Sequence, residues 1–203
     1  MVRWEPGAAD RLRAAALDLY TLQGFEQTTV AEIAAAAGVT ERTFFRHFAD
    51  KREVLFEREE LLAKGFLEGV ATAPADAAPL EIVAHALAAS APFFSDDRRS
   101  WSRRRQSVID LNPALQEREL LKLARLAAMV AAALRERGVV EPAASLAAES
   151  GLIVLRVSFG RWIAEGERRP LGAIEQAVLQ DLRVMTAPAI HPTEVPTRPE
   201  ATS

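Results

Sequence analysis

Residues 24–56, GFEQTTVAEIAAAAGVTERTFFRHFADKREVLF, decide the fold of the N-terminal part of this chain. Thr29 is placed to cap a first short helix, and Glu32, three residues later, can bond back to the Thr29 amide in a capping box. Gly38 suits the left-handed position that ends this helix, and Thr40 can cap a second helix that follows directly. The pattern predicts a helix-turn-helix unit.

The second helix of this unit divides its residues between an inward and an outward face. Phe44 and Phe48 lie four residues apart, so we expect both rings to be buried. In a helix-turn-helix protein the opposite face lies in the major groove of DNA. That face carries Glu41, Arg42, Thr43, Phe45, Arg46 and His47. A solvated helix face is the alternative interpretation, because many packed helix pairs share this pattern.

Asp50 and Glu53 repeat the capping-box spacing, which predicts that the third helix begins at Lys51. At the start of a helix, free amide groups and a cationic side chain can both meet a phosphate. Lys51 is therefore a candidate for a contact with the DNA backbone.

The same stretch resembles the N-terminal domain of the TetR family of bacterial transcriptional regulators. The resemblance is carried by a Thr-Val pair, an Ile-Ala pair, Ala-Gly-Val, then Thr, two bulky residues, X-His-Phe and a Lys three residues beyond. It implies phosphate contacts at Thr29, Thr40, His47 and Lys51, and base-edge contacts at Glu41, Arg42, Thr43 and Arg46. The family usually has tyrosine where this chain has Phe45, and a phenyl ring can pack against sugar or a thymine methyl but cannot donate to a phosphate.

Composition favours helices throughout the 203 residues, because alanine is abundant and aromatic residues make up only 6%. The chain has no cysteine, which excludes a disulfide framework and suits a cytoplasmic location. No signal peptide is evident, and the longest apolar run, 152–159, is too short to span a bilayer, so we expect no membrane partner. The net charge is −3, but four of the basic groups before residue 53 lie within 42–52, where phosphates would sit.

The positions of proline and glycine between the helical stretches predict an all-α protein of about nine helices. The expected helices are 8–23, 30–37, 41–48, 51–72, 79–94, 98–111, 113–137, 142–165 and 170–186. We expect a helix-turn-helix DNA-binding domain over 1–52, an effector-binding and dimerisation domain over 53–186, and a disordered tail over 187–203, which holds four prolines and no periodicity.

The last two long helices indicate a homodimer. The final helix carries one apolar stripe, whereas 152–159 is apolar nearly all round and needs cover on more than one side. The stripe consists of Leu171, Ile174, Val178, Leu182 and Met185. The family resemblance implies a four-helix bundle between two copies, which would present two reading heads to a palindromic operator of double-stranded DNA. Burial within one copy alone is the alternative.

The helices between 79 and 165 are expected to enclose a small-molecule effector. The candidate lining residues are Phe93, Phe94, Trp101, Arg104, Arg105, Val108, Met129, Arg156, Phe159 and Trp162, although ordinary core packing would also explain most of them. Arg104 or Arg105 shares a helix face with Trp101 and Val108, and a buried cation needs an anionic partner. Arg156 is expected either to pair with Glu149, the favoured alternative, or to meet an anionic ligand.

Residues 103–139 also resemble a TetR branch associated with acyl-coenzyme A-like ligands, which implies an anionic, apolar effector such as an acyl-CoA. The three histidines are scattered and no cysteine is present, so no catalytic residue, metal or cofactor is expected. The sequence thus predicts a homodimeric repressor that an effector releases from DNA. An all-α enzyme, or a helical lipid or acyl carrier with a degenerate DNA-binding head, is the alternative.

Overall fold

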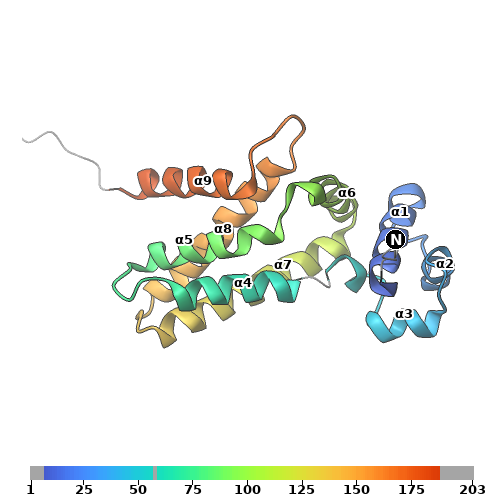
Figure 1. The fold of residues 1–203 in the computed structure, drawn as a ribbon, viewed down its shortest axis with the longest axis horizontal. Helices are drawn as coiled ribbons and strands as arrows, with labels where there is room; N and C mark the ends of the chain where they lie inside the picture. Colours follow the sequence, from blue (N-terminus) through green and yellow to red (C-terminus); the bar gives the residue numbers. More distant parts are fainter. Residues whose placement is uncertain (1–6, 57–58, 188–203) are drawn as a thin grey trace, which may run out of the picture.

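The structure, a computed structural model, describes residues 7–56 and 59–187, and in these ranges it contains helices and turns but no strand (Figure 1). The described α-helices are α1 (Ala8–Gln23), α2 (Val30–Ala36), α3 (Glu41–His47), α4 (Glu59–Thr72), α5 (Pro79–Ser90), α6 (Arg99–Asp110), α7 (Pro113–Glu136), α8 (Ala143–Trp162) and α9 (Leu171–Thr186). Helices α1–α3 group at one end of an elongated molecule, and α9 lies along the outside of the other end. The all-α prediction is confirmed. Most of the tail prediction lies outside the described residues.

The helix-turn-helix unit forms as its caps predict. The Glu32 amide donates to the Thr29 hydroxyl at 3.2 Å, and the Glu32 carboxylate accepts the Thr29 amide at 2.8 Å. The Thr40 side chain accepts the amide of Thr43 at 3.2 Å at the start of α3. Gly38 has a φ of +66°, the left-handed conformation that glycine tolerates. The predicted capping box at residues 29–32 is confirmed.

The prediction that the third helix begins at Lys51 is wrong. Residues 51 and 52 form a turn, residues 53–55 form one turn of 3-10 helix, and α4 begins at Glu59. The Asp50 carboxylate accepts the amides of Arg52 and Glu53, at 2.7 and 3.1 Å. The Glu53 carboxylate, however, pairs with cations of α7 instead of returning to residue 50, so only half of the capping box forms.

The predicted helix 79–94 is also too long. Helix α5 ends at Ser90, and a 3-10 turn, Ala91–Phe93, follows it. Pro92 lies in this turn, and a proline has no amide to continue the α-helical ladder. The two phenylalanines at 93 and 94 therefore leave the helix axis and pack as a pair, with ring centroids 4.8 Å apart.

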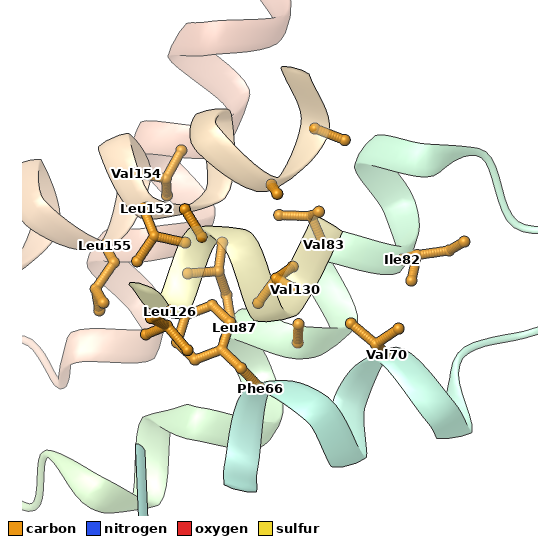
Figure 2. Close-up of a cluster of buried hydrophobic side chains, with 14 of the residues drawn as sticks. Phe66, Val70, Ile82, Val83, Leu87, Leu126, Val130, Leu152, Val154 and Leu155 are labelled. Carbon is orange, nitrogen blue, oxygen red and sulfur yellow. The ribbon is translucent and has the colours of Figure 1, made fainter. Parts of the chain in front are cut away.

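The larger hydrophobic core joins α4, α5, α7, α8 and α9. Phe66 and Val70 of α4, Leu87 of α5 and Val130 of α7 belong to one cluster of buried side chains (Figure 2). Helices α4 and α5 approach closely because residue 69 is glycine: a Cβ there would lie 2.5 Å from the Cα of Ala86. This core supports the cavity described below.

The smaller hydrophobic core joins α1–α3 to α6 and the start of α7. Val108, Ile109 and Leu115 are buried in the same cluster as Phe44 and Phe56. The helix-turn-helix unit is therefore packed directly on helices that the sequence assigned to the second domain. The boundary after residue 52 remains a prediction, but the two parts share a core.

Helix α8 is, among the described helices, the one that is long and apolar enough by length and composition to cross a membrane, which the shorter run 152–159 did not indicate. Of its most apolar window, 44% is buried inside the protein. Core helices of proteins that contact no membrane pass the same test.

Candidate nucleic-acid interface and ligand cavity

The outward face of α3 is held in place by two buried rings. Phe44 and Phe48 are 0% and 3% exposed, as predicted, and their ring centroids lie 5.4 Å apart. The exposed side chains on the other face are Glu41, Arg42, Phe45, Arg46 and His47, and Thr43 is half-buried. Neither Arg42 nor Arg46 has an ion pair or hydrogen bond with any residue in the described ranges. Two uncompensated cations therefore lie on the face predicted to read DNA.

Phe45 projects from the same face. Its side chain is 56% exposed, and its ring meets the Phe44 ring edge-on at 5.4 Å. Single exposed apolar side chains are common on protein surfaces, but a ring at this place on α3 suits contact with sugar or a base methyl group.

The predicted phosphate-contacting threonines carry hydrogen bonds within their own caps. The Thr29 hydroxyl donates to the Glu32 carboxylate at 2.8 Å, and the hydroxyls of Thr40 and Thr43 lie 3.1 Å apart. The amide and then the hydroxyl of Thr29 hold the pKa of Glu32 below its ordinary value. Both threonines are exposed, so phosphate contacts at Thr29 and Thr40 remain predictions.

The surroundings of Lys51 differ from the expectation. Its ammonium group donates to the carbonyls of residues 25, 26 and 28, at 2.9, 3.2 and 3.0 Å, and lies 4.5 Å from the centroid of the Phe25 ring. Since an ammonium group has three N–H donors, these bonds use all of them. Lys51 therefore fastens the loop between α1 and α2 and is not poised to bind a phosphate.

Tyr20 secures the same turn from α1. Its hydroxyl donates to the Lys51 carbonyl at 2.6 Å. Burial, with the nearby charge of Asp50, raises the pKa of Tyr20 well above its ordinary value, so the hydroxyl remains a donor. The turn after α3 is thus tied to α1 through its backbone and to the α1–α2 loop through its side chain.

A cavity of about 1460 Å³ extends from the end of α3 to α8. Seven of the predicted effector residues line it, namely Phe93, Phe94, Trp101, Arg105, Met129, Arg156 and Phe159. The rings of Phe94 and Phe159 lie 5.6 Å apart and form an aromatic patch on its wall. Apolar side chains share the lining with seven basic and five acidic residues of the described ranges. A small-molecule site is usually apolar with a small number of placed polar groups, so this cavity is more highly charged than most.

Three of the predicted effector residues do not line this cavity. Arg104 pairs with Asp18 of α1 at 2.6 Å, because the outer side of α6 faces the helix-turn-helix unit. Val108 is buried in the smaller core. Trp162 is 0% exposed and lies behind the aromatic patch, 6.0 Å from the Phe94 ring.

Arg156 is exposed and lines the cavity, so the expected pairing with Glu149 is wrong. Within the described ranges it has no ion pair or hydrogen bond. Two further cations, Lys64 of α4 and Arg125 of α7, were not foreseen; they also line the cavity and have no ion pair or hydrogen bond with any described residue. Arg125 lies four residues before Met129, so a search for cations sharing the face of the predicted lining residues would have found it.

One acidic group in this part of the molecule is buried without a partner. Glu175 of α9 is 3% exposed, and neither carboxylate oxygen has a hydrogen bond within the described part of the chain. Burial raises its pKa to about 7. The Ser158 hydroxyl of α8 is also buried and unbonded. The sequence analysis did not single out Glu175.

Helix α8 also presents an apolar stripe to solvent. Leu146, Ile153 and Val157 are 64%, 48% and 39% exposed, and their spacing places them on one side of the helix. The predicted α9 stripe faces inward over most of its length: Ile174 is 0% and Val178 is 7% exposed, because both pack in the larger core. Its last member, Met185, is 82% exposed. The outer side of α9 carries Ala173, Ala177 and Val184.

The N-terminal part of the chain is similar to known regulatory proteins. Residues 12–57 match the model described as bacterial regulatory proteins, tetR family. Over 80 residues the chain is 42% identical to the HTH-type transcriptional regulator TcmR of Streptomyces glaucescens, a stretch that covers 39% of this chain and 35% of that protein. The match therefore spans about a third of the curated relative.

Solved structures share the whole fold. FadR from Bacillus subtilis, in complex with stearoyl-CoA, matches with a TM-score of 0.59 at 19% identity, covering 85% of this chain and 96% of that one. FadR from Thermus thermophilus, in complex with lauroyl-CoA, matches with a TM-score of 0.53 at 24% identity, covering 95% and 100%. At these identities the likeness concerns the fold.

Proposed function

We infer that the chain is a DNA-binding transcriptional regulator of the TetR family, because residues 12–57 match the model of that family and an 80-residue stretch is 42% identical to a transcriptional regulator. The observation that carries the inference is the outward face of α3, where Arg42 and Arg46 are exposed and uncompensated above two buried rings. An arginine at the start of a recognition helix is suited to read guanine in the major groove.

We propose that Arg42 and Arg46, with Glu41, Thr43 and Phe45, contact bases, and that Thr29, Thr40 and His47 contact the backbone. Selection from a randomised DNA library should return a two-fold symmetric motif. Arg42→Ala should weaken binding to that motif by about 1–3 kcal/mol and relax one base position in each half-site. If the selected DNA has no common motif, the proposal fails.

The working form we propose is a homodimer joined through the outer faces of α8 and α9. Leu146, Ile153 and Val157 are exposed on α8, and Ala173 and Ala177 are exposed on α9, where small side chains allow close helix approach. A two-fold axis through this face would present two α3 helices to the two halves of a palindromic operator.

The effector we propose is an anionic amphipathic molecule such as a long-chain acyl-CoA. Support comes from the aromatic patch and from the acyl-CoA held by two proteins of similar fold. Further support comes from Lys64, Arg125 and Arg156, which line the cavity and form no ion pair within the described ranges. The chain would act as a repressor in the cytoplasm, leaving its operator when the effector binds.

Lauroyl-CoA should raise the melting temperature by mass action, corresponding to about 2.7 kcal/mol at a hundredfold excess over the dissociation constant. Because Arg156 has no ion-pair or hydrogen-bond partner among the described residues, Arg156→Met should reduce this gain and leave the ligand-free melting temperature unchanged. An all-α enzyme or a lipid carrier would bind acyl-CoA without releasing DNA. Sequence-specific DNA binding that responds to the ligand separates the regulator from both.

A further inference from the structure

Arg105, which lines the cavity, also contacts residues 55–56, which follow the helix-turn-helix unit in the chain. Its guanidinium donates to the Leu55 carbonyl at 2.8 Å and pairs with Glu119 at 2.9 Å. The same group lies 4.9 Å from the centroid of the Phe56 ring. One cation of the cavity wall therefore touches both the backbone and a ring of residues 55–56.

Lys122 of α7 also contacts this segment, at Glu53 and Phe56. Its ammonium group lies 3.3 Å from the Glu53 carboxylate and 5.4 Å from the centroid of the Phe56 ring. Arg118 adds a second cation to Glu53, at 2.6 Å. Lys122 and Glu53 both line the cavity, so this ion pair is within reach of a bound ligand.

These ion pairs are partly shielded from water. The side chains of Arg105, Lys122, Glu53 and Glu119 are 13%, 16%, 19% and 24% exposed. Charge attraction is stronger in such places than at a surface, and a cation that loses its partner there needs another. An anion that enters the cavity would compete with Glu53 and Glu119 for the two cations.

The beginning of this segment, residues 50–53, is fixed to the helix-turn-helix unit, which we call the reading head (α1–α3). The Asp50 carboxylate accepts the amides of Arg52 and Glu53, and the Lys51 ammonium binds three carbonyls of the loop before α2. Residues 50–56 therefore run from the cavity wall to the loop that positions α2 and α3. A shift at Glu53 would be passed directly to this loop.

We propose that the anionic group of the effector exchanges with Glu53 and Glu119 for Lys122 and Arg105, and that this ion-pair exchange loosens the reading head. The proposal rests on the function inferred above and names how that cavity is regulated. Without ligand, the two cations hold residues 53–56 in the arrangement that binds DNA. With ligand bound, the same two cations hold its anionic group. Binding of the operator and binding of the effector therefore require different partners for these cations and oppose each other.

The test compares Glu53→Gln with Asp18→Asn. Asp18 pairs with Arg104 across the same junction but does not line the cavity. Operator affinity is measured by fluorescence anisotropy, and lauroyl-CoA affinity by calorimetry on DNA-free protein. Glu53→Gln should weaken the operator by about five- to tenfold and tighten lauroyl-CoA by a similar factor, because coupling between two sites is reciprocal. Asp18→Asn should change neither by more than about twofold.

Glu119→Gln frees Arg105 and leaves the Glu53 pairs intact. It should also weaken operator binding and tighten lauroyl-CoA binding, and it replaces Glu53→Gln as the test if that variant does not fold. A weaker operator with unchanged ligand affinity would assign Glu53 a merely structural role and overturn the exchange. So would an effect no larger than that of Asp18→Asn.

Three ligands show which anionic group of the effector takes part in the exchange. Release by lauroyl-CoA alone assigns the exchange to the coenzyme phosphates, and release by laurate as well assigns it to any terminal anion. Dodecanol fills the apolar cavity without a charge and should leave the operator bound. Release by dodecanol would overturn the ion-pair exchange while leaving a ligand-responsive regulator in place, whereas absence of sequence-specific DNA binding would contradict the proposed function itself.

Discussion

Replacing Glu175 by glutamine should change how the stability of the protein depends on pH. The carboxyl group is 3% exposed without a hydrogen-bond partner in the described ranges, and burial raises its pKa from 4.5 to about 7. Because the folded-state pKa lies above the unfolded value, the stability contribution is fully present below pH 4.5 and is lost as the pH rises to about 7. A pKa difference of this size corresponds to about 3 kcal/mol at high pH.

Glutamine is neutral at every pH, so the variant avoids this loss. Chemical denaturation at one fixed protein concentration should show Glu175→Gln within about 1 kcal/mol of the wild type at pH 5 but more stable by about 3 kcal/mol at pH 8. Glu149→Gln removes one charge from an exposed position of α8 and controls for net charge. A difference between Glu175→Gln and wild type that is the same at both pH values would refute the reasoning.

Three further predictions concern packing, the DNA-binding unit and assembly. Gly69→Ala should cost about 1–3 kcal/mol of unfolding free energy, because its Cβ would lie 2.5 Å from the Cα of Ala86, whereas Gly172→Ala, with its nearest contact at 3.6 Å, should not destabilise. Lys51→Met should lower stability by about 2–3 kcal/mol while leaving the salt dependence of DNA binding unchanged, and a flatter salt slope would restore the phosphate contact. Light scattering should show the proposed dimer for the wild type and a folded monomer for Ile153→Glu, and a variant that stays dimeric would place the interface elsewhere.

The local fold was predictable wherever a cap or a glycine fixes the backbone. The capping box at Thr29, the N-cap at Thr40 and the left-handed Gly38 placed α2 and α3 to within one residue. The start of α4 was not predictable, because the spacing of Asp50 and Glu53 is the same whether or not the box closes. Here the Glu53 carboxylate finds cations 65 residues or more away in sequence.

The candidate site was only partly predictable for the same reason. Periodicity shows which residues share a face, but it cannot say which neighbour that face meets. Arg104 and Val108 turn toward the helix-turn-helix unit, and only the tertiary packing of α6 on α1 determines this. Arg156 was expected among buried residues, and its exposure follows from the cavity beside α8.

The most direct test of the regulator account is a titration of the protein, bound to its selected operator, with lauroyl-CoA while fluorescence anisotropy reports the DNA. The account predicts a two-fold symmetric operator bound far more tightly than random DNA, by about a thousandfold or more, and complete release as the ligand saturates the protein. Equal affinity for operator and random DNA would contradict it. A saturating ligand that leaves the operator bound would contradict the proposed link between cavity and reading head.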